Sequence, residues 1–409
     1  MVNRDRAIAA GLVLGLMIGL LASRGSPGMT RLADALEPVG TAFVNLVRLV
    51  VVPIVATTVF TGVVRLGDPR RLGRIGGVTL AFFLGTMVIA VLIGMAVMSL
   101  ALSFAPETVP PPAEERPPDR LPGTVEFLLG LIPTNIVDVA ARSALLPLVV
   151  FSVLFGAAVA TLPEERRRPL TTLAESVTDA MIRMVHWILW TAPIGVLALA
   201  AAATARAGWS LLQNLAVFVI GVLVALVVFV VAVYAPAIRF LGRQPVGRFF
   251  RVAAAPTMIG ASATSSAAAL PAMLDVADRD LGVSPAVAGF VLSLGAAINR
   301  TGSALFQGAV IVFLASLYGV SISFVQLVTA VFSTVLVAMT VAGVPSASLV
   351  TVVPVLQALG IPTAGLAMLF GVDRIPDMAR TGVHVIGHLG TAVIANRLVQ
   401  AGPAKDRVP

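Results

Sequence analysis

The chain has 409 residues, of which 58% are hydrophobic and only 12% are charged, and its mean hydropathy is +0.99. Soluble domains carry about 25% charged residues, so this composition excludes a water-soluble globular protein and predicts a chain solvated by lipid. Cysteine is absent, which excludes disulfides and thiolate sites, and the net charge of +8 comes from short basic clusters between apolar runs, a pattern that argues against nucleic acid as a partner.

Long apolar runs fill the first 240 residues. A membrane span needs about 20 apolar residues, and the sequence offers six candidates: 7–23, 38–63, 77–104, 126–161, 174–202 and 211–238. The first run follows Arg4 and Arg6, as a signal peptide would. The many later runs and the poor cleavage site after Ala22 favour a first transmembrane helix instead.

The second half of the chain changes character. Residues 250–299 and 325–355 are rich in Gly, Ala, Ser, Thr and Pro, which predicts broken or re-entrant helices. A helix from about 284 is expected to break at residues 299–303 and to resume to about 318, and a final helix covers about 364–397. Two small-residue segments, 265–271 and 342–348, are the kind of interrupted pair that marks a binding site at the membrane midplane.

Basic clusters predict the orientation. They follow the second, fourth and sixth apolar runs, and they comprise Arg65, Arg70, Arg71 and Arg74, then Arg166, Arg167 and Arg168, then Arg239, Arg243, Arg248 and Arg251. The proline-rich segment 106–122 falls on the opposite side. We therefore expect a multi-pass protein of a prokaryotic cell (inner or plasma) membrane, with both termini cytoplasmic.

One face of the final helix carries the most informative residues. Asp373, Asp377, Arg380, His384 and His388 share an arc of roughly 80° at ~100° per residue. Buried charge in a membrane normally marks a solute or ion path, although an internal ladder of both aspartates with the arginine would also explain three of these residues. An arginine fork suits a carboxylate and a nearby aspartate suits an ammonium group, so the pattern predicts a zwitterion or an acidic amino acid.

These residues belong to a longer series of motifs. The series comprises Phe43-Val44-Asn45-Leu46-Val47-Arg48 leading to Pro53, Ile132-Pro133-Thr134-Asn135, Ala192-Pro193-Ile194-Gly195, both hairpin tips, and Gly371-Val372-Asp373 through Asp377-Met378-Ala379-Arg380-Thr381. In order and spacing the chain resembles the dicarboxylate/amino acid:cation symporter family, the glutamate and aspartate transporters. The resemblance implies an all-α polytopic membrane protein with eight transmembrane helices, two re-entrant helical hairpins, inverted repeats, an elevator mechanism and a homotrimeric assembly.

The same resemblance implies a division of the chain. Its parts are scaffold helices 1–2 in 1–76; transport-domain helix 3, an external loop and scaffold helix 4 in 77–161; scaffold helix 5 and transport-domain helix 6 in 162–238; the transport-domain core of both hairpins and helices 7 and 8 in 239–400; and a tail in 401–409.

Site residues are carried over from the family by position. Arg380 is expected to bind the substrate's distal carboxylate and Asp377 its amino group, which favours amino acids over plain dicarboxylates. Further substrate contacts are expected from Thr381, His384, Ser266, Ser303 and the backbone of Val344. The gate is expected at the hairpin tips, with Ser265, Gly343 and Pro345.

The residues expected to couple a cation depart from the family. They are Asn299, Arg300, Thr301, Asp373 and His388. At the break of the seventh helix the family reads Asn-Met-Asp-Gly-Thr, whereas Thr301 replaces the sodium-binding acid here and Arg300 replaces the methionine. Sodium prefers hard oxygen ligands, and a unit positive charge 4–5 Å away costs an incoming cation ~3–4 kcal/mol at an effective dielectric of ~20.

We therefore hypothesise that Arg300 is a tethered substitute for sodium that neutralises Asp373. The alternatives are that Arg300 pairs structurally or extends outward, while a residual cation site supports conventional sodium-coupled symport.

Two histidines leave a further question open. His384 and His388 replace residues that contact substrate and sodium in the family, and they lie four positions apart on one face. They could carry a coupled proton, hold a transition metal ion with an aspartate, or line the site as neutral hydrogen-bonded rings. No other cofactor is indicated.

Other functional classes fit less well. No HExxH motif, nucleophile–base pair or cofactor motif is present, so an enzyme is not expected. A channel or a solute sensor on the same fold stays an alternative. The sequence best predicts a secondary active transporter of an acidic amino acid or related carboxylate.

Overall fold

The computed structural model of the chain describes residues 2–66, 73–105, 132, 134–142, 145–339, 341 and 346–400. Within these ranges the regular elements are all helical. Three helical stretches among the described residues, Ile75–Leu102, Trp209–Leu241 and Pro285–Leu317, are long and apolar enough to cross a membrane by length and composition, and the last of them is interrupted at residues 299–300. The fold class is therefore confirmed as far as all-helical, whereas the expected eight spans stay a prediction.

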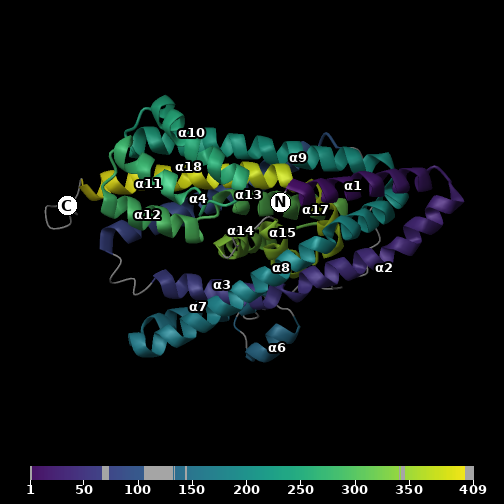
Figure 1. The fold of residues 1–409 in the computed structure, drawn as a ribbon, viewed down its shortest axis with the longest axis horizontal. Helices are drawn as coiled ribbons and strands as arrows, with labels where there is room; N and C mark the ends of the chain where they lie inside the picture. Colours follow the sequence, from purple (N-terminus) through teal and green to yellow (C-terminus); the bar gives the residue numbers. More distant parts are fainter. Residues whose placement is uncertain are drawn as a thin grey trace.

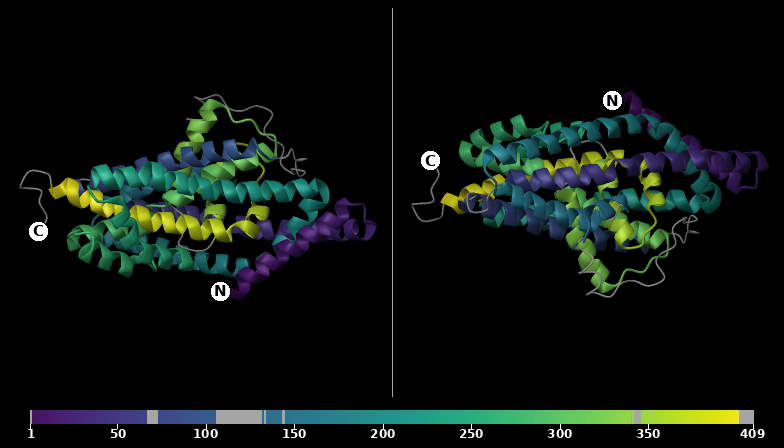
Figure 2. Two further views of the ribbon diagram at one scale, coloured as in Figure 1. Left: turned by 90° about the horizontal axis from the view of Figure 1, so that it is seen from above. Right: turned by 90° about the horizontal axis from the view of Figure 1, so that it is seen from below.

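One set of helices packs mainly within itself. It comprises α1 (Val2–Ser23), α2 (Pro27–Leu49), α3 (Val51–Leu66), α7 (Leu145–Ala160) and the long α8 (Glu164–Ala207). The apolar run 38–63 was expected to be one helix, but a turn at Val50 divides it between α2 and α3. Figures 1 and 2 show α1 and α2, in purple, reaching the end of the molecule opposite the C-terminus.

Glycines bring α1 and α8 together. Gly11 and Gly15 are four residues apart on one face of α1. A Cβ atom on them would lie 2.2 Å from the Pro193 carbonyl oxygen and 2.3 Å from that of Leu197. Only glycine permits this approach of two backbones, which is a common way for helices to associate in lipid.

The second set of helices forms the core. It comprises α4 (Gly73–Leu102), α9 (Trp209–Phe229) with its π-helical continuations η1 (Val230–Tyr234) and η2 (Ala237–Leu241), α10 (Val246–Ala263), α11 (Leu270–Arg279), α12 (Pro285–Ile298), α13 (Thr301–Leu317), α14 (Phe324–Met339), α15 (Ala347–Thr351), α16 (Val353–Ala358), η3 (Thr363–Gly365), α17 (Leu366–Val372) and α18 (Arg374–Gln400). Helix α6 (Ile136–Ala141) is short and contacts α7. Figure 1 shows α18, in yellow, running lengthwise beside α9 and α10.

The interruptions fall close to where composition predicts them. α10 ends at Ala263, its C-cap Thr264 adopts a left-handed backbone with φ of 48°, and α11 begins at Leu270. α12 ends before Asn299, and α13 begins at Thr301. The final helix differs from its expected course, because a turn at Asp373 separates α17 from α18. At such interruptions the backbone polar groups that the helix no longer pairs lie beside polar side chains inside the protein.

Candidate functional site

The break between α12 and α13 lies directly against α18. A Cβ on Gly302 would stand 2.5 Å from the backbone oxygen of Arg380, so the start of α13 can approach α18 only because residue 302 is glycine. From there α13 is buried along nearly all of its length. The two elements that carry the expected site residues therefore meet at one point inside the protein.

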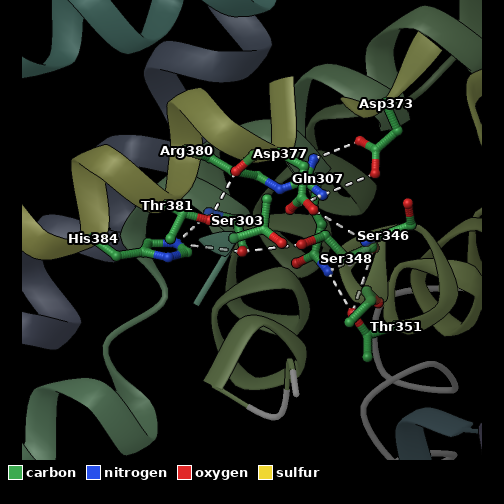
Figure 3. Close-up of polar contacts among 12 residues, drawn as sticks. Ser303, Gln307, Ser346, Ser348, Thr351, Asp373, Asp377, Arg380, Thr381 and His384 are labelled. Atoms are coloured by element: carbon green, nitrogen blue, oxygen red, sulfur yellow. Dashed lines mark hydrogen bonds and ion pairs between the residues drawn. The ribbon is translucent and has the colours of Figure 1, made fainter. Parts of the chain in front are cut away.

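Arg380 forms a closed ion-pair ladder with both aspartates of α18. Its Nη1 lies 2.7 Å from Asp373 Oδ1, and its Nη2 lies 3.0 Å from Asp373 Oδ2 and 2.8 Å from Asp377 Oδ1 (Figure 3). The guanidinium also stands over the Phe306 ring, 4.1 Å from its centroid. Arg380 is 1% exposed. The internal ion-pair ladder, which the sequence left as an alternative explanation of these residues, is therefore present.

The arm that returns from the second interruption reaches this ladder. The Ser346 backbone N–H donates to Asp377 Oδ2 at 3.3 Å, and the Ser348 hydroxyl donates to Ser303 Oγ at 3.0 Å (Figure 3). The Thr381 hydroxyl donates to the Asp377 backbone oxygen at 2.8 Å, as in many helices, so it does not enter this contact. The expected gate residues Gly343 and Pro345, together with Val344, lie outside the described residues.

Gln307 is a site residue that sequence reasoning missed. Its Nε2 donates to the Ser348 carbonyl oxygen at 3.1 Å and to Thr351 Oγ1 at 2.8 Å, so it ties α15 to α13. The signal that could have found it is a single amide in an otherwise apolar stretch of a buried helix. Such a group needs a partner, because an unpaired buried amide is costly.

Arg300 forms its hydrogen bond with the segment between α10 and α11, and not with the aspartates. Its Nη1 donates to Ser266 Oγ at 3.0 Å, and the residue is 7% exposed. No carboxylate in the part of the chain that the structure describes forms an ion pair with it. Arg300 therefore does not pair with Asp373 in this structure, because Arg380 contacts both oxygens of that carboxylate, and the role of Arg300 as a substitute for sodium stays a prediction. Ser265 stays within its own turn, where its Oγ accepts from Ala268 N at 3.4 Å.

The two histidines contact the break between α12 and α13 through their Nε2 atoms. His384 Nε2 accepts from the Ser303 backbone N–H at 3.1 Å, and His388 Nε2 lies 3.1 Å from the Asn299 backbone oxygen. The two rings are stacked with centroids 6.5 Å apart. Both Nδ1 atoms are buried without a partner. Among the described residues, no group of three His, Cys, Asp or Glu side chains could hold a metal ion.

Thr301 belongs to a chain of neutral polar groups. Its hydroxyl donates to Asn299 Oδ1 at 2.5 Å and accepts from the Tyr234 hydroxyl at 3.1 Å. Tyr234, on η1, was not expected here. Nearby, Phe83 and Met87 are fully buried, and they present no oxygen ligand from their side chains.

Few oxygen atoms of the described polar groups around the break are free to bind sodium. Both aspartates are held by Arg380, the Asn299 backbone oxygen faces His388, and the Thr301 hydroxyl is occupied. At the break itself, the buried side-chain atoms without a partner are Asn299 Nδ2, Arg300 Nε and two histidine Nδ1 atoms, and further along α13 the Gln307 Oε1 atom is also without one. Amide and guanidinium nitrogens carry hydrogens and repel a cation, whereas sodium needs oxygen ligands.

Comparison with known proteins shows which family this sequence resembles. The family model described as the sodium:dicarboxylate symporter family matches residues 6–398. The chain is 33% identical over 403 residues to the proton/glutamate-aspartate symporter of Escherichia coli (strain K12), covering 95% of this chain and 91% of the relative. It is 30% identical over 398 residues to the proton/sodium-glutamate symport protein of Bacillus caldotenax, covering 95% and 93%. A C4-dicarboxylate transport protein of Anaeromyxobacter sp. (strain K) is also 30% identical over 398 residues, covering 95% and 89%.

Proposed function

This chain belongs to the sodium:dicarboxylate symporter family, and from that premise we propose that it is a secondary active transporter of an acidic amino acid or related carboxylate. The observation that carries the proposal is the buried ladder of Arg380 with Asp377 beneath the returning arm at Ser346. It offers a cation for a carboxylate and an anion for an ammonium group at one place inside the protein. A transporter, not an enzyme, is the function supported by the family.

Binding would proceed by exchange of partners. Arg380 Nη2 contacts both aspartates, so it can leave Asp377 while its Nη1 stays on Asp373. Asp377 would then receive the substrate ammonium, and Arg380 would receive a substrate carboxylate. New ion pairs would replace the old pairs, so no buried charge would be left without a partner during loading.

We propose further that sodium does not drive this transporter. Two observations support it: Arg380 already pairs with both Asp373 and Asp377, and Arg300 adds a second positive charge at the break between α12 and α13, so the two carboxylates leave no net negative charge for a cation. Arg300 thus acts against a cation by its charge and not through the pairing with Asp373 that the sequence suggested. Conventional sodium-coupled symport is the competing function, and the name of the Bacillus caldotenax relative includes both proton and sodium.

Proton coupling is the second candidate. The unpaired Nδ1 atom of His388 is the observation behind it, because His388 Nε2 donates to the Asn299 backbone oxygen and Nδ1 keeps a lone pair that can take up a proton. The relative from Escherichia coli is named a proton/glutamate-aspartate symporter.

The wider mechanism is proposed from the resemblance. The helix set around α13 and α18 would move as the transport domain, and the set around α1 and α8 would be the static scaffold of a homotrimer. The observation that each set packs mainly within itself supports this division. The protein would lie in the cell membrane with both termini on the cytoplasmic side.

A thermal-shift experiment on the purified protein tests the proposal. Ligand that binds the folded state raises its melting temperature by linkage. Acidic amino acids or C4-dicarboxylates should stabilise the protein equally in sodium and in choline, whereas neutral amino acids should not. Counterflow in proteoliposomes then separates a carrier from a channel or a sensor. Stabilisation only in sodium would support the competing function.

A further inference from the structure

Arg300 is a buried cation whose hydrogen-bonding capacity is almost unused. One of its terminal nitrogens donates to Ser266, and its Nε is buried without a partner. A guanidinium carries five N–H donors in a planar fork that matches a carboxylate. No carboxylate among the described residues forms an ion pair with Arg300, and the charge of Asp377, which acts on it from beyond ion-pair distance, is shared with Arg380. A buried charge without a direct partner is costly. Such a group is therefore prepared for an anionic ligand.

Arg380 is in the opposite condition. It makes three contacts of 2.7–3.0 Å with two carboxylates and covers an aromatic ring. A substrate carboxylate that bound Arg380 would have to displace at least one aspartate. A carboxylate that bound Arg300 would break no ion pair with a described residue. The first carboxylate to enter the site therefore meets less resistance at Arg300.

The surroundings of Arg300 favour the same ligand. Arg300 immediately precedes α13, a helix of 17 residues, and the N-terminus of a helix carries partial positive charge. The Ser266 hydroxyl holds the guanidinium by a hydrogen bond from the first hairpin, and Ser266 is itself 1% exposed. The positive charge of Arg300, its unpaired N–H donors and the N-terminus of α13 therefore lie together, next to Ser266.

We propose that Arg300 recognises one carboxylate of the transported acid, through Nε and a terminal nitrogen, while Arg380 keeps Asp373. The inference rests on the proposed function and names the residue that selects for a carboxylate on the side of the first hairpin. It also gives Ser266 a positioning role, since its hydroxyl orients the fork. An acidic amino acid would then span from Arg300 to the Asp377–Arg380 pair.

Calorimetry on the purified full-length protein tests this with glutamate and its two monoamides, glutamine and isoglutamine. In the wild type, the amide that replaces the carboxylate held by Arg300 should bind roughly 30-fold more weakly than the acid, or worse. Arg300→Gln should bring that acid-to-amide ratio to within about twofold of unity. Arg300→Lys, which keeps the charge and loses the fork, should give an intermediate ratio.

Arg248→Gln is the matched control. Arg248 donates from Nη2 to the Asp280 carbonyl oxygen at 2.9 Å, outside the site, so its loss should leave both ratios as in the wild type. Unchanged ratios for both amides in Arg300→Gln would overturn the inference, and so would unchanged ratios in Arg300→Lys should the glutamine variant fail to fold. If the wild type binds no acidic amino acid or dicarboxylate at all, the proposed function itself fails.

Discussion

Arg380 closes on Asp373 with two parallel contacts, Nη1 to Oδ1 at 2.7 Å and Nη2 to Oδ2 at 3.0 Å, across seven positions of the chain. Asp373 lies in the turn between α17 and α18, and Arg380 lies in the second turn of α18. The pair therefore ties this turn to the beginning of α18. Both side chains are buried, at 1% and 0% exposed. This pair settles how the two central charges of the site are balanced, and it limits what a cation could find there.

Removal of that carboxylate should destabilise the protein. Asp373→Asn leaves Arg380 with Asp377 alone, and loss of one partner from a buried pair costs roughly 3–5 kcal/mol. We expect a clear drop in the melting temperature of the detergent-solubilised protein.

The exposed pair of Arg142 and Asp138 provides the control. Its atoms are 2.8 Å apart, a similar distance, but its side chains are 76% and 50% exposed. Asp138→Asn should change stability by less than about 1 kcal/mol, because water screens the pair. Equal losses in both variants would show that the buried ladder does not stabilise the fold.

Sodium dependence should be restorable. The double variant Arg300→Met with Thr301→Asp removes the positive charge and supplies an anionic oxygen ligand, which sodium requires. Sodium should then raise the melting temperature of the variant, in proportion to ligand binding. The wild type and each single variant are the controls, and a wild type that responds to sodium as strongly as the double variant would refute the charge argument.

Loss of the His384 acceptor should be felt at Ser303. His384→Ala leaves the buried Ser303 N–H, which donates to Nε2 at 3.1 Å, without a partner. An unsatisfied buried donor costs about 1–3 kcal/mol. His384→Gln can supply an amide oxygen at a similar reach, so its melting temperature should lie between those of the alanine variant and the wild type. Identical melting temperatures would mean that the contact carries no stability.

The returning arm should loosen when Gln307 is removed. Gln307→Leu deletes both hydrogen bonds to Ser348 and Thr351, so the amides of residues 347–358 should exchange hydrogen faster. Gln326→Leu is the control, because Gln326 accepts from the Ser323 N–H at 2.8 Å on an exposed part of the chain. Unchanged exchange over 347–358 would show that Gln307 does not hold the arm.

Sequence pattern predicted the elements whose cause is local. Small residues and prolines located both interruptions, and helical spacing brought Asp373, Asp377 and Arg380 onto one face. The break before Thr301 follows from the same polar, glycine-containing stretch. Family resemblance supplied the order of the elements, and the comparison confirmed the family over residues 6–398.

Pairing choices could not be predicted in the same way. Spacing on a helix places three charges within reach of one another, but it does not say that Arg380 takes both aspartates and leaves Arg300 without one. That outcome depends on where the segment between α10 and α11 lies, because its Ser266 accepts the hydrogen bond of Arg300. The partner of Gln307 comes from an arm more than 40 residues further along the chain. Contacts of that range depend on tertiary packing, which periodicity does not contain.

Uptake by the reconstituted protein tests the central claim most directly. Proteoliposomes should accumulate or exchange a radiolabelled acidic amino acid or C4-dicarboxylate with saturable kinetics, at the same rate when choline replaces all sodium. Empty liposomes and the Arg380→Gln variant should show background uptake. Uptake that appears only in sodium, or that no acidic solute can saturate, would contradict the account.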